Sequence, residues 1–469
     1  MEHSNSKGQW GSKFGFLMAA VGSAVGLGNL WGFPYKMGKG GGFAFLLIYV
    51  ALVVLVGVVT LLAELSLGRK SGKGVIGAYQ SLGSKYTIIG WFGWISPLLI
   101  LGFYSMLGGY CIKYAIANIG DLFNASWGVG GMESGAFFTE FYTDQLQTVV
   151  FTVIFVALTI LIVRNGVSEG IEKFSGIAMP TLFVMLLIVI IRSVTLPGAE
   201  AGLEFVFKPN FDVFKGSGWI NVLALAGGQM FFSVSLGMGI MVTYGSYMKK
   251  SDNLTESALI IPFADTVIAI MASMAIMPAV FASGQSPTQG PGLLFITLQT
   301  VFQAMGKIGP IFGFLFYTLV FIAAITSSIS LTEAVGSTLM DKLENKGKKS
   351  DRKKITLAVG IFTMLEGSFV ALDGLGSHGF PQIFGQSTWL DSFDLVSEGL
   401  LMPIGALATA IIFGWIKPEY LYDEISNGNG SSFKIRKYFH ICIKWIVPPI
   451  MILVLLGQID TFFKLGWFS

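Results

Sequence analysis

The stretch Gly22-Ser-Ala-Val-Gly-Leu-Gly-Asn29 decides the fold, because it places a run of small residues inside an apolar segment of membrane-spanning length. A second apolar segment, in the other half of the chain, contains Gly227-Gly-Gln-Met-Phe-Phe-Ser-Val-Ser-Leu-Gly-Met-Gly239. Glycine lowers helix stability, and unpaired backbone groups are expensive in hydrocarbon unless they line a site enclosed by protein. Two such breaks predict a substrate site near the middle of the membrane. Close helix packing is the alternative, since small residues also let helices approach.

The composition around these segments is that of a membrane protein. The chain has 469 residues, of which 53% are hydrophobic and 12% are charged, and its mean hydropathy is +0.70. A helix needs about 20 apolar residues to cross a bilayer. Eleven stretches of this kind occur, at 14–35, 41–66, 88–118, 146–163, 171–196, 218–248, 257–283, 309–340, 355–372, 393–416 and 440–463. They lack the strict alternation of membrane strands, so we predict an all-α membrane protein.

The positions of lysine and arginine predict the topology, since cytoplasmic loops are enriched in both. Most basic residues fall on the side of the N-terminus, and the loop 118–145 has four acidic residues and no basic one. We therefore expect a plasma-membrane protein with a cytoplasmic N-terminus and an extracellular C-terminus. The predicted parts are a cytoplasmic segment 1–13, helices 1–5 at 14–196, an extracellular loop 197–217, helices 6–10 at 218–417, a cytoplasmic loop 418–439, and helix 11 with a short extracellular tail at 440–469.

Other classes of protein find little support in the sequence. The two cysteines, Cys111 and Cys442, lie within predicted spans, and the three histidines are far apart. No group of residues has catalytic spacing, so we expect no enzyme. The formal net charge of +3 reflects topology, and we expect no nucleic-acid partner.

The run Gly22-Ser-Ala-Val-Gly-Leu-Gly-Asn-Leu-Trp-Gly-Phe-Pro-Tyr35, followed by Gly40-Gly-Gly-Phe43, closely resembles the first-helix signature of the neurotransmitter:sodium symporter family. Further similar motifs are Glu64-Leu-Ser-Leu-Gly-Arg69, Phe103-Tyr-Ser105, the block from Gln229 to Tyr247, Gly290-Pro-Gly-Leu-Leu-Phe295 and Ala323-Ala-Ile-Thr-Ser-Ser-Ile-Ser330. The resemblance implies a LeuT-like fold of two inverted five-helix repeats, and sodium-coupled uptake of an amino acid. The eleven-helix count is similar to the bacterial branch of the family that transports hydrophobic and aromatic amino acids.

The resemblance also implies two sodium sites. The first would use the Ala24 carbonyl, Asn29, Ser233, Asp265 and the substrate carboxylate. The second would use the carbonyls of Gly22, Val25 and Ala323 with the hydroxyls of Thr326 and Ser327. Oxygen donors of this kind suit a hard cation such as sodium. Without the resemblance, the two hydroxyls are more simply explained as bonding back to their own helix.

The same resemblance assigns the substrate contacts. The backbone N–H groups of Leu27 and Gly28 and the Tyr104 hydroxyl would receive a carboxylate. The carbonyls of Ala24, Phe232 and Ser233, together with Ser235, would receive an ammonium group. Monoamine carriers of this family have an acidic residue where this chain has Gly26, so an amino acid that brings its own carboxylate is the expected substrate.

The predicted side-chain pocket is mostly apolar. It would be lined by Ile100, Tyr104, Phe232, Ser235, Met238, Ser327 and Leu331. The Gly237-Met238-Gly239 sequence resembles the variant found in bacterial members that take bulky amino acids, in which a flexible methionine replaces a rigid aromatic ring. Tyrosine, tryptophan, phenylalanine and leucine are therefore the expected substrates, although plain packing also explains apolar residues on a helix.

Asp265 is a carboxylate within a predicted span, and such residues are usually functional. Family members that need chloride have neutral residues around this position. The resemblance therefore implies that Asp265 supplies the fixed negative charge beside the first sodium ion, and that no chloride is required. A proton-coupled carrier of a related fold remains the alternative.

Two gates are implied by the resemblance. The inner gate would consist of Lys7, Trp10, Tyr244, Tyr247 and Asp341. The outer gate departs from the family, because its usual arginine is Gly32 here, while the acidic partner is present as Asp394. Either Lys36 pairs with Asp394, or Tyr104 and Phe232 close over the substrate by themselves. In the fifth helix, Gly170 and Pro180 resemble a motif that opens this helix, and a static kink is the alternative.

Overall fold

The computed structural model describes residues 8–216, 218–288, 290, 292–426 and 436–468, and these residues form a helical protein. Nine helical segments in this part of the chain are long and apolar enough to cross a membrane. They are Phe43–Ser71 (α3 Phe43–Leu52 and α4 Val58–Ser71), Ser84–Leu122 (α6 Thr87–Leu122), Gln145–Val163 (α8), Val167–Val194 (α9 Lys173–Val194), Leu254–Ala282 (α13), Gly306–Glu344 (α15 Gly309–Glu344), Arg352–Leu372 (α16), Trp389–Ile416 (α17 Trp389–Asp394 and α18 Met402–Ile411) and Arg436–Phe463 (α20 Arg436–Ile441 and α21 Val447–Phe463). Each agrees with a predicted stretch to within a few residues at its ends.

The first predicted span is broken. Helix α1 (Lys13–Ala24) ends at the small-residue run, and the chain continues through a π-helical turn, Gly28–Gly32, into α2 (Phe33–Lys39). The axes of the two parts differ by 45°. The interruption therefore lies where the glycines predicted it.

The sixth predicted span is broken as well. Helix α11 (Gly218–Ser233) and helix α12 (Ile240–Ser246) are separated by a non-helical segment at 234–239. Neither part alone is long enough to cross a bilayer. With the nine continuous segments, the two broken ones account for the eleven predicted spans.

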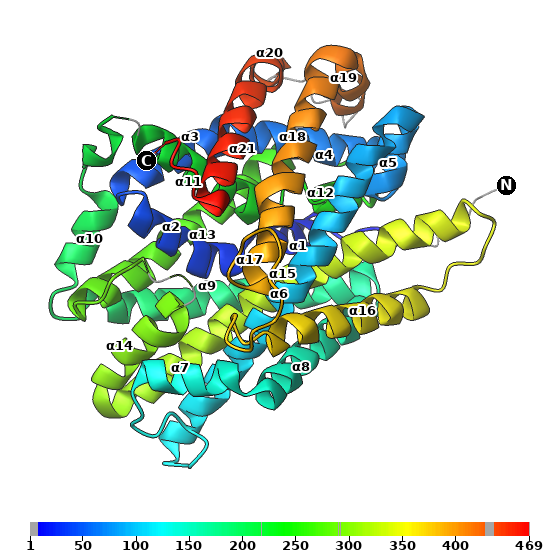
Figure 1. Cartoon of the computed structure of the whole chain (residues 1–469). Coiled ribbons are helices and arrows are strands. Elements are labelled where there is room, and N and C mark those ends of the chain that lie inside the picture. Colours follow the sequence, from blue (N-terminus) through cyan, green and yellow to red (C-terminus); the bar gives the residue numbers. More distant parts are fainter. Residues whose placement is uncertain (1–7, 217, 289, 291, 427–435, 469) are drawn as a thin grey trace.

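The two broken spans lie inside the bundle, and longer helices surround them (Figure 1). Helix α1 packs against α9, α13 and α15, and α12 packs against α4. Large apolar side chains face outward from the surrounding helices, such as Phe263, Ile177 and Leu365, each about 70% exposed. This arrangement leaves an apolar surface for lipid and a polar centre formed by the breaks.

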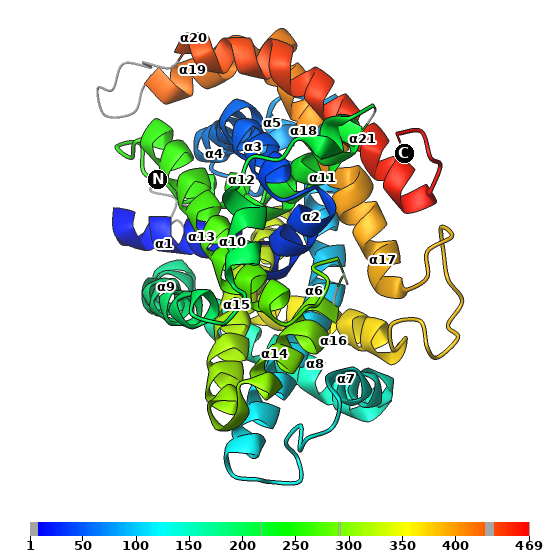
Figure 2. The ribbon, with the colours of Figure 1, turned by 90° about the vertical axis from the view of Figure 1, so that its left-hand side faces the viewer.

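Short helices occupy the connections between spans. They are α5 (Val75–Ser81), α7 (Ser134–Thr143), α10 (Glu200–Phe207), α14 (Leu298–Ala304) and α19 (Pro418–Ser426). Helices α7 and α14 lie together at one end of the bundle, whereas α19 and α20 lie at a different edge (Figure 2). The sequence predicted these segments only as loops.

Candidate functional site

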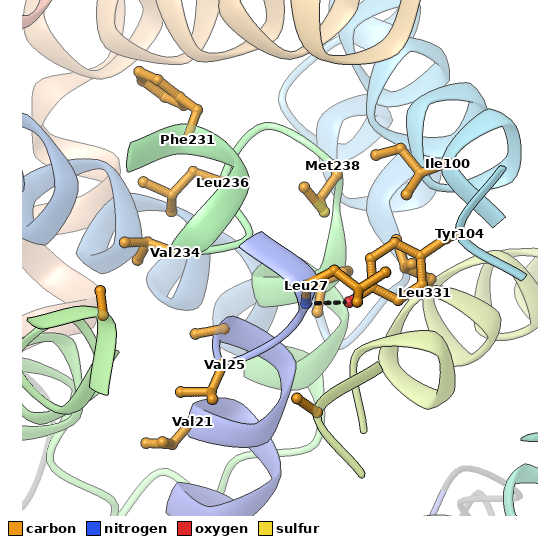
Figure 3. Close-up of a cluster of buried hydrophobic side chains, with 14 of the residues drawn as sticks. Val21, Val25, Leu27, Ile100, Tyr104, Phe231, Val234, Leu236, Met238 and Leu331 are labelled. Atoms are coloured by element: carbon orange, nitrogen blue, oxygen red, sulfur yellow. Dashed lines mark hydrogen bonds between the residues drawn. The ribbon is translucent and has the colours of Figure 1, made fainter. Parts of the chain in front are cut away.

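The first break exposes backbone groups at Val25, Gly26 and Leu27. The Leu27 N–H donates to the Tyr104 hydroxyl at 3.0 Å (Figure 3), and the Gly26 N–H donates to Asn29 Oδ1 at 3.0 Å. Both donors lie outside the regular helix and bond to side chains, so a ligand at this point of the membrane could take the place of a side-chain acceptor.

The second break contains three residues with positive φ. Ser235, Gly237 and Gly239 have φ values of 57°, 75° and 71°. Serine in the left-handed region is strained by roughly 1–2 kcal/mol, and strain of this kind concentrates at functional sites. The Gly237 N–H donates to the buried carboxyl group of Glu64 at 2.8 Å, which holds the break against α4.

The two breaks face each other across hydrogen bonds. The Ser235 hydroxyl donates to the Ser23 carbonyl at 3.0 Å, and the Gln229 side-chain amide donates to the Gly28 carbonyl at 2.7 Å. Because each bond joins α1 or its break to α11 or its break, the interrupted segments form one polar centre.

A cavity lies at this centre. Its lining consists of Ser23, Ala24, Gly26, Gly28, Ile100, Tyr104, Phe232, Ser235, Met238, Ile240, Ser327 and Leu331. About 300 Å³ between these residues is not filled by protein atoms, and little of this space is wide enough for a water molecule. All seven residues of the predicted side-chain pocket are brought together here. Ile100, Met238 and Leu331 lie near one another on the side of Tyr104 (Figure 3). Ser23 and Ile240 are lining residues that the sequence did not indicate.

Asp265 is fully buried and is the centre of a second polar cluster. It accepts from the Asn29 amide at 2.7 Å, from the Ser233 hydroxyl at 2.9 Å and from the Tyr49 hydroxyl at 3.0 Å. Asn29, Ser233 and Asp265 were predicted as ligands of one ion, and they lie within hydrogen-bond distance. Tyr49 in α3 was missed, since a tyrosine in an apolar run gives no signal.

The residues predicted for the second sodium site also lie together. The Ser327 hydroxyl is 3.4 Å from the Gly22 carbonyl and 3.3 Å from the Ala323 carbonyl. The Thr326 hydroxyl bonds back to Ile322 and Ala323 of its own helix at 3.0 Å. Back-bonding therefore occurs at Thr326, whereas Ser327 also reaches across to α1. Val25, the remaining predicted ligand, is in the break itself.

Aromatic residues close the side of the site toward the N-terminus. The Trp10 indole donates to the Tyr244 carbonyl at 3.1 Å and packs edge-on against the rings of Tyr244 and Tyr247. Asp341 accepts from the backbone N–H of Gly74. Lys7, also predicted here, lies outside the described residues.

This inner closure includes an ion pair that the sequence did not reveal. The Tyr247 hydroxyl donates to Glu333 at 2.6 Å, and Glu333 pairs with Arg352 at the start of α16. Glu333 and Arg352 lie in different helices, so their spacing along the chain gives no indication that they form an ion pair.

On the opposite side, Lys36 forms the ion pair of the outer closure. Its ammonium group is 2.6 Å from Glu398 Oε1, so its ion pair is formed one helical turn beyond Asp394, the partner that the sequence suggested as one alternative. Asp394 and Glu398 line the same cavity of about 270 Å³, together with Gly28 and Phe232. Because Gly28 and Phe232 also line the central cavity, Phe232 separates the two.

The fifth span is helical throughout in this conformation. A π-helical turn, Val167–Glu172, contains Gly170, and α9 continues through Pro180. The start of this span is tied to the N-terminal segment, since Glu172 accepts from the Gly11 N–H and the Ser12 hydroxyl at 2.7 Å each.

A helical bundle with two broken spans around a closed polar cavity, and with separate closures on its two sides, is the architecture of a secondary transporter. The family model for the sodium:neurotransmitter symporter family matches residues 7–129 and 142–468. The chain belongs to this family, and it is therefore a sodium-dependent membrane transporter and no enzyme. Because the family is sodium-dependent, the alternative of a proton-coupled carrier has no support.

Proteins of similar sequence align with nearly the whole chain. The uncharacterized sodium-dependent transporter YhdH of Bacillus subtilis is 35% identical over 96% of this chain and 97% of its own length. An uncharacterized sodium-dependent transporter of Haemophilus influenzae is 32% identical over 96% of this chain and 98% of its own length.

A solved structure matches the whole fold. The crystal structure of MhsT in complex with L-phenylalanine has a TM-score of 0.86 and 35% identity, and the match covers 97% of this chain and 100% of that one. The predicted all-α, LeuT-like fold is thereby confirmed.

Proposed function

We propose that this transporter carries bulky hydrophobic or aromatic amino acids into the cell, with sodium as the driving ion and without chloride. The observation that carries the proposal is the central cavity, which joins a polar end at the Tyr104 hydroxyl, the acceptor of the Leu27 N–H, to apolar walls at Ile100, Met238 and Leu331. An amino acid with an apolar side chain likewise has a polar end and an apolar end. The similarity to MhsT, whose crystal structure contains L-phenylalanine, supports the same substrate class.

The polar end suits a zwitterion. The N–H groups of Leu27 and Gly28 and the Tyr104 hydroxyl would bind the carboxylate, in exchange for the bond between Leu27 and Tyr104. The carbonyls of Ala24, Phe232 and Ser233, together with the Ser235 hydroxyl, would accept from the ammonium group. A ligand with no carboxylate would offer the Leu27 and Gly28 N–H groups no acceptor, so it could not compensate for the loss of the bond between Leu27 and Tyr104.

We propose two sodium ions. The first would bind at the Ala24 carbonyl, Asn29, Ser233, Asp265 and the substrate carboxylate. The second would bind at the carbonyls of Gly22, Val25 and Ala323 and the hydroxyls of Thr326 and Ser327. Asp265 supports independence of chloride, because it places a fixed negative charge beside the first ion.

The proposed orientation puts the N-terminus in the cytoplasm and the C-terminus outside, in the plasma membrane. It rests on the distribution of basic loops. Under this topology Trp10, Tyr244, Tyr247 and Asp341 form the inner closure, and Lys36 and Glu398 form the outer one, with Phe232 between the outer cavity and the substrate.

Uptake into liposomes tests the proposal. Purified protein with an imposed inward sodium gradient should accumulate radiolabelled phenylalanine, tyrosine, tryptophan or leucine, and much less glycine. Replacing chloride with gluconate should leave uptake unchanged. Uptake limited to small amino acids would contradict the substrate class, and loss of uptake in gluconate would contradict chloride independence.

A further inference from the structure

A glutamate lies within the membrane-spanning helix α16 and takes no part in the transport site or its closures. This residue is Glu366, and its side chain is half-buried. Helix α16 packs against α6, α8 and α15 (Figure 1). An ionisable residue within a membrane span is costly, so its surroundings indicate what it can do.

Glu366 lies at the depth of the central cavity. A Cβ atom added to Gly102 in α6 would be 2.8 Å from the Glu366 Cγ atom and 3.0 Å from its Cδ atom. Gly102 stands between Ile100 and Tyr104 in the sequence, and both of these residues line the central cavity. Substrate sites of transporters with broken helices lie near the middle of the bilayer. The Glu366 carboxyl group therefore lies against the backbone of α6 deep in the membrane.

The face of α16 beside Glu366 is directed toward lipid. Phe362, Leu365 and Phe369 are all exposed apolar residues. Phe362 and Phe369 lie one helical turn before and one turn after Glu366, whereas Gly367 is buried. Glu366 therefore lies at the boundary between the lipid-facing side of α16 and its contact with α6.

Within the described residues, the Glu366 carboxyl group has no cationic partner. Its Oε2 atom is buried without a hydrogen-bond donor, and no ion pair of the described residues includes Glu366. A carboxylate here would be a charge in apolar surroundings without a compensating partner, and such a charge is far more costly than the neutral acid. The acid form is therefore favoured at this position.

The ionisable side chains of the neighbouring helices are directed elsewhere, and α8 has none. In α6, Tyr104 lines the central cavity and Lys113 donates to Gln147. In α15, Glu333 pairs with Arg352. The two acidic residues of α17, Asp391 and Asp394, line the outer cavity. None of these groups supplies a charge that would favour ionisation of Glu366.

We propose that Glu366 is held as the protonated acid in the membrane, and that it is the site at which lipid-soluble carbodiimides modify and block this transporter. The acid O–H adds across one C=N bond of the carbodiimide, so that a C–O bond forms and the proton passes to that nitrogen. The acyl group then moves from oxygen to the other nitrogen, and no atom is lost. The adduct would press against Gly102 and hinder movement of α6 beside the cavity.

Peptide mass spectrometry of the purified full chain after treatment with dicyclohexylcarbodiimide at neutral pH tests the site. A glutamate in water is ionised at this pH, because its ordinary pKa is about 4.3, and it reacts poorly. The wild-type protein should carry one adduct, on Glu366, and Glu366→Gln should lose it. The matched control is Glu204→Gln, which removes an exposed glutamate of α10 and should keep the adduct. A water-soluble carbodiimide should leave Glu366 unmodified.

Sodium-driven uptake of phenylalanine into liposomes tests the effect on α6, and this readout rests on the proposed function. The treated wild type should lose uptake, whereas treated Glu366→Gln should keep the uptake of its untreated form. Absence of uptake before treatment would contradict the proposed function, and the adduct would still report on the site. The proposal would be overturned by a wild type without an adduct on Glu366, by modification of Glu366 with the water-soluble reagent, by an adduct that leaves uptake unchanged, or by equal loss of uptake in Glu366→Gln.

Discussion

Gly26 has very little room in the central cavity. A Cβ atom at this position would lie 2.4 Å from both the Ser327 hydroxyl and the Tyr104 hydroxyl. Gly26→Ala should therefore displace the Tyr104 hydroxyl, which is proposed to meet the substrate carboxylate, and the Ser327 hydroxyl, which lines the same cavity. Overpacking of this kind costs about 1–3 kcal/mol. We expect the affinity for labelled phenylalanine to fall by about tenfold or more in an equilibrium binding assay.

Gly336 provides the matched control for this change. It lies in α15, and no atom would be within 4 Å of an added Cβ. Gly336→Ala should leave binding unchanged and slightly stabilise the helix, since alanine is the better helix former. If Gly26→Ala bound phenylalanine as tightly as the wild type, the cavity would not be the substrate site.

The second prediction concerns the ion pair between Lys36 and Glu398. Because their ion pair joins α2 to the tenth span and is largely buried, Lys36→Ala should weaken the outer closure and reduce phenylalanine transport by about tenfold, as for coupled charge pairs. Lys39→Ala is the control, because Lys39 lines the same cavity and stacks on Tyr35. Transport that fell equally in both variants would contradict a specific role for Lys36.

The residues of the cavity were predictable and the gate partners were not. Most of the proposed backbone ligands lie within the two glycine-rich runs, which carry the family resemblance from which they were predicted. Glu398, Glu333 and Arg352 acquire their roles from helices that meet only in the folded molecule. Asp394 and Glu398 lie four residues apart, on the same face of the tenth span, so the choice between them depends on the position of this span along its axis relative to α2. The sequence does not reveal that position.

Ion pairs hold helix α19 against the membrane-spanning part of the protein. The Arg69 guanidinium is 2.7 Å from Glu424, and Lys250 is 2.7 Å from the same carboxyl group. Burial alone would raise the pKa of Glu424, but Lys250 and Arg69 hold the pKa below its usual range. A carboxyl group with a lowered folded-state pKa stabilises the fold above its unfolded pKa and loses this contribution as the pH falls through its folded pKa.

Glu424→Gln is therefore expected to lower stability at neutral pH, by about 3 kcal/mol if the buried arginine is left unpaired. Thermal unfolding in detergent should show this. Acidification below the ordinary glutamate pKa of about 4.3 should begin to reduce the difference between variant and wild type, and the difference should vanish once the pH is below the lowered folded-state pKa of Glu424. The control is Glu419→Gln in the same helix, where the side chain is exposed. A difference that stayed constant with pH would contradict the electrostatic explanation.

Spans were predictable and short helices were not, for a physical reason. A long segment of high hydropathy is stable in lipid, so hydropathy along the sequence predicts the membrane spans. Helix α7 is stabilised instead by contacts with distant residues, since Phe141 packs on Tyr110 and Phe137 on Tyr114. A ten-residue helix of this kind has little stability of its own, so its sequence carries a weak signal.

The molecule as a whole brings distant segments to one place. Asn29, Ser233 and Asp265 come from three spans and meet around one carboxylate, beside the cavity that Leu27 and Tyr104 close. A ligand and an ion that share these groups should affect each other's binding equally, since coupling between sites is reciprocal.

The dependence of phenylalanine affinity on sodium tests the central claim most directly, because the claim is that the two broken helices bind amino acid and sodium together. Equilibrium binding to the purified protein should be measured in sodium and in potassium at the same ionic strength. We predict that replacing sodium with potassium weakens binding by about tenfold or more, within the usual range of coupling energies. An equal affinity in the two salts would contradict the account.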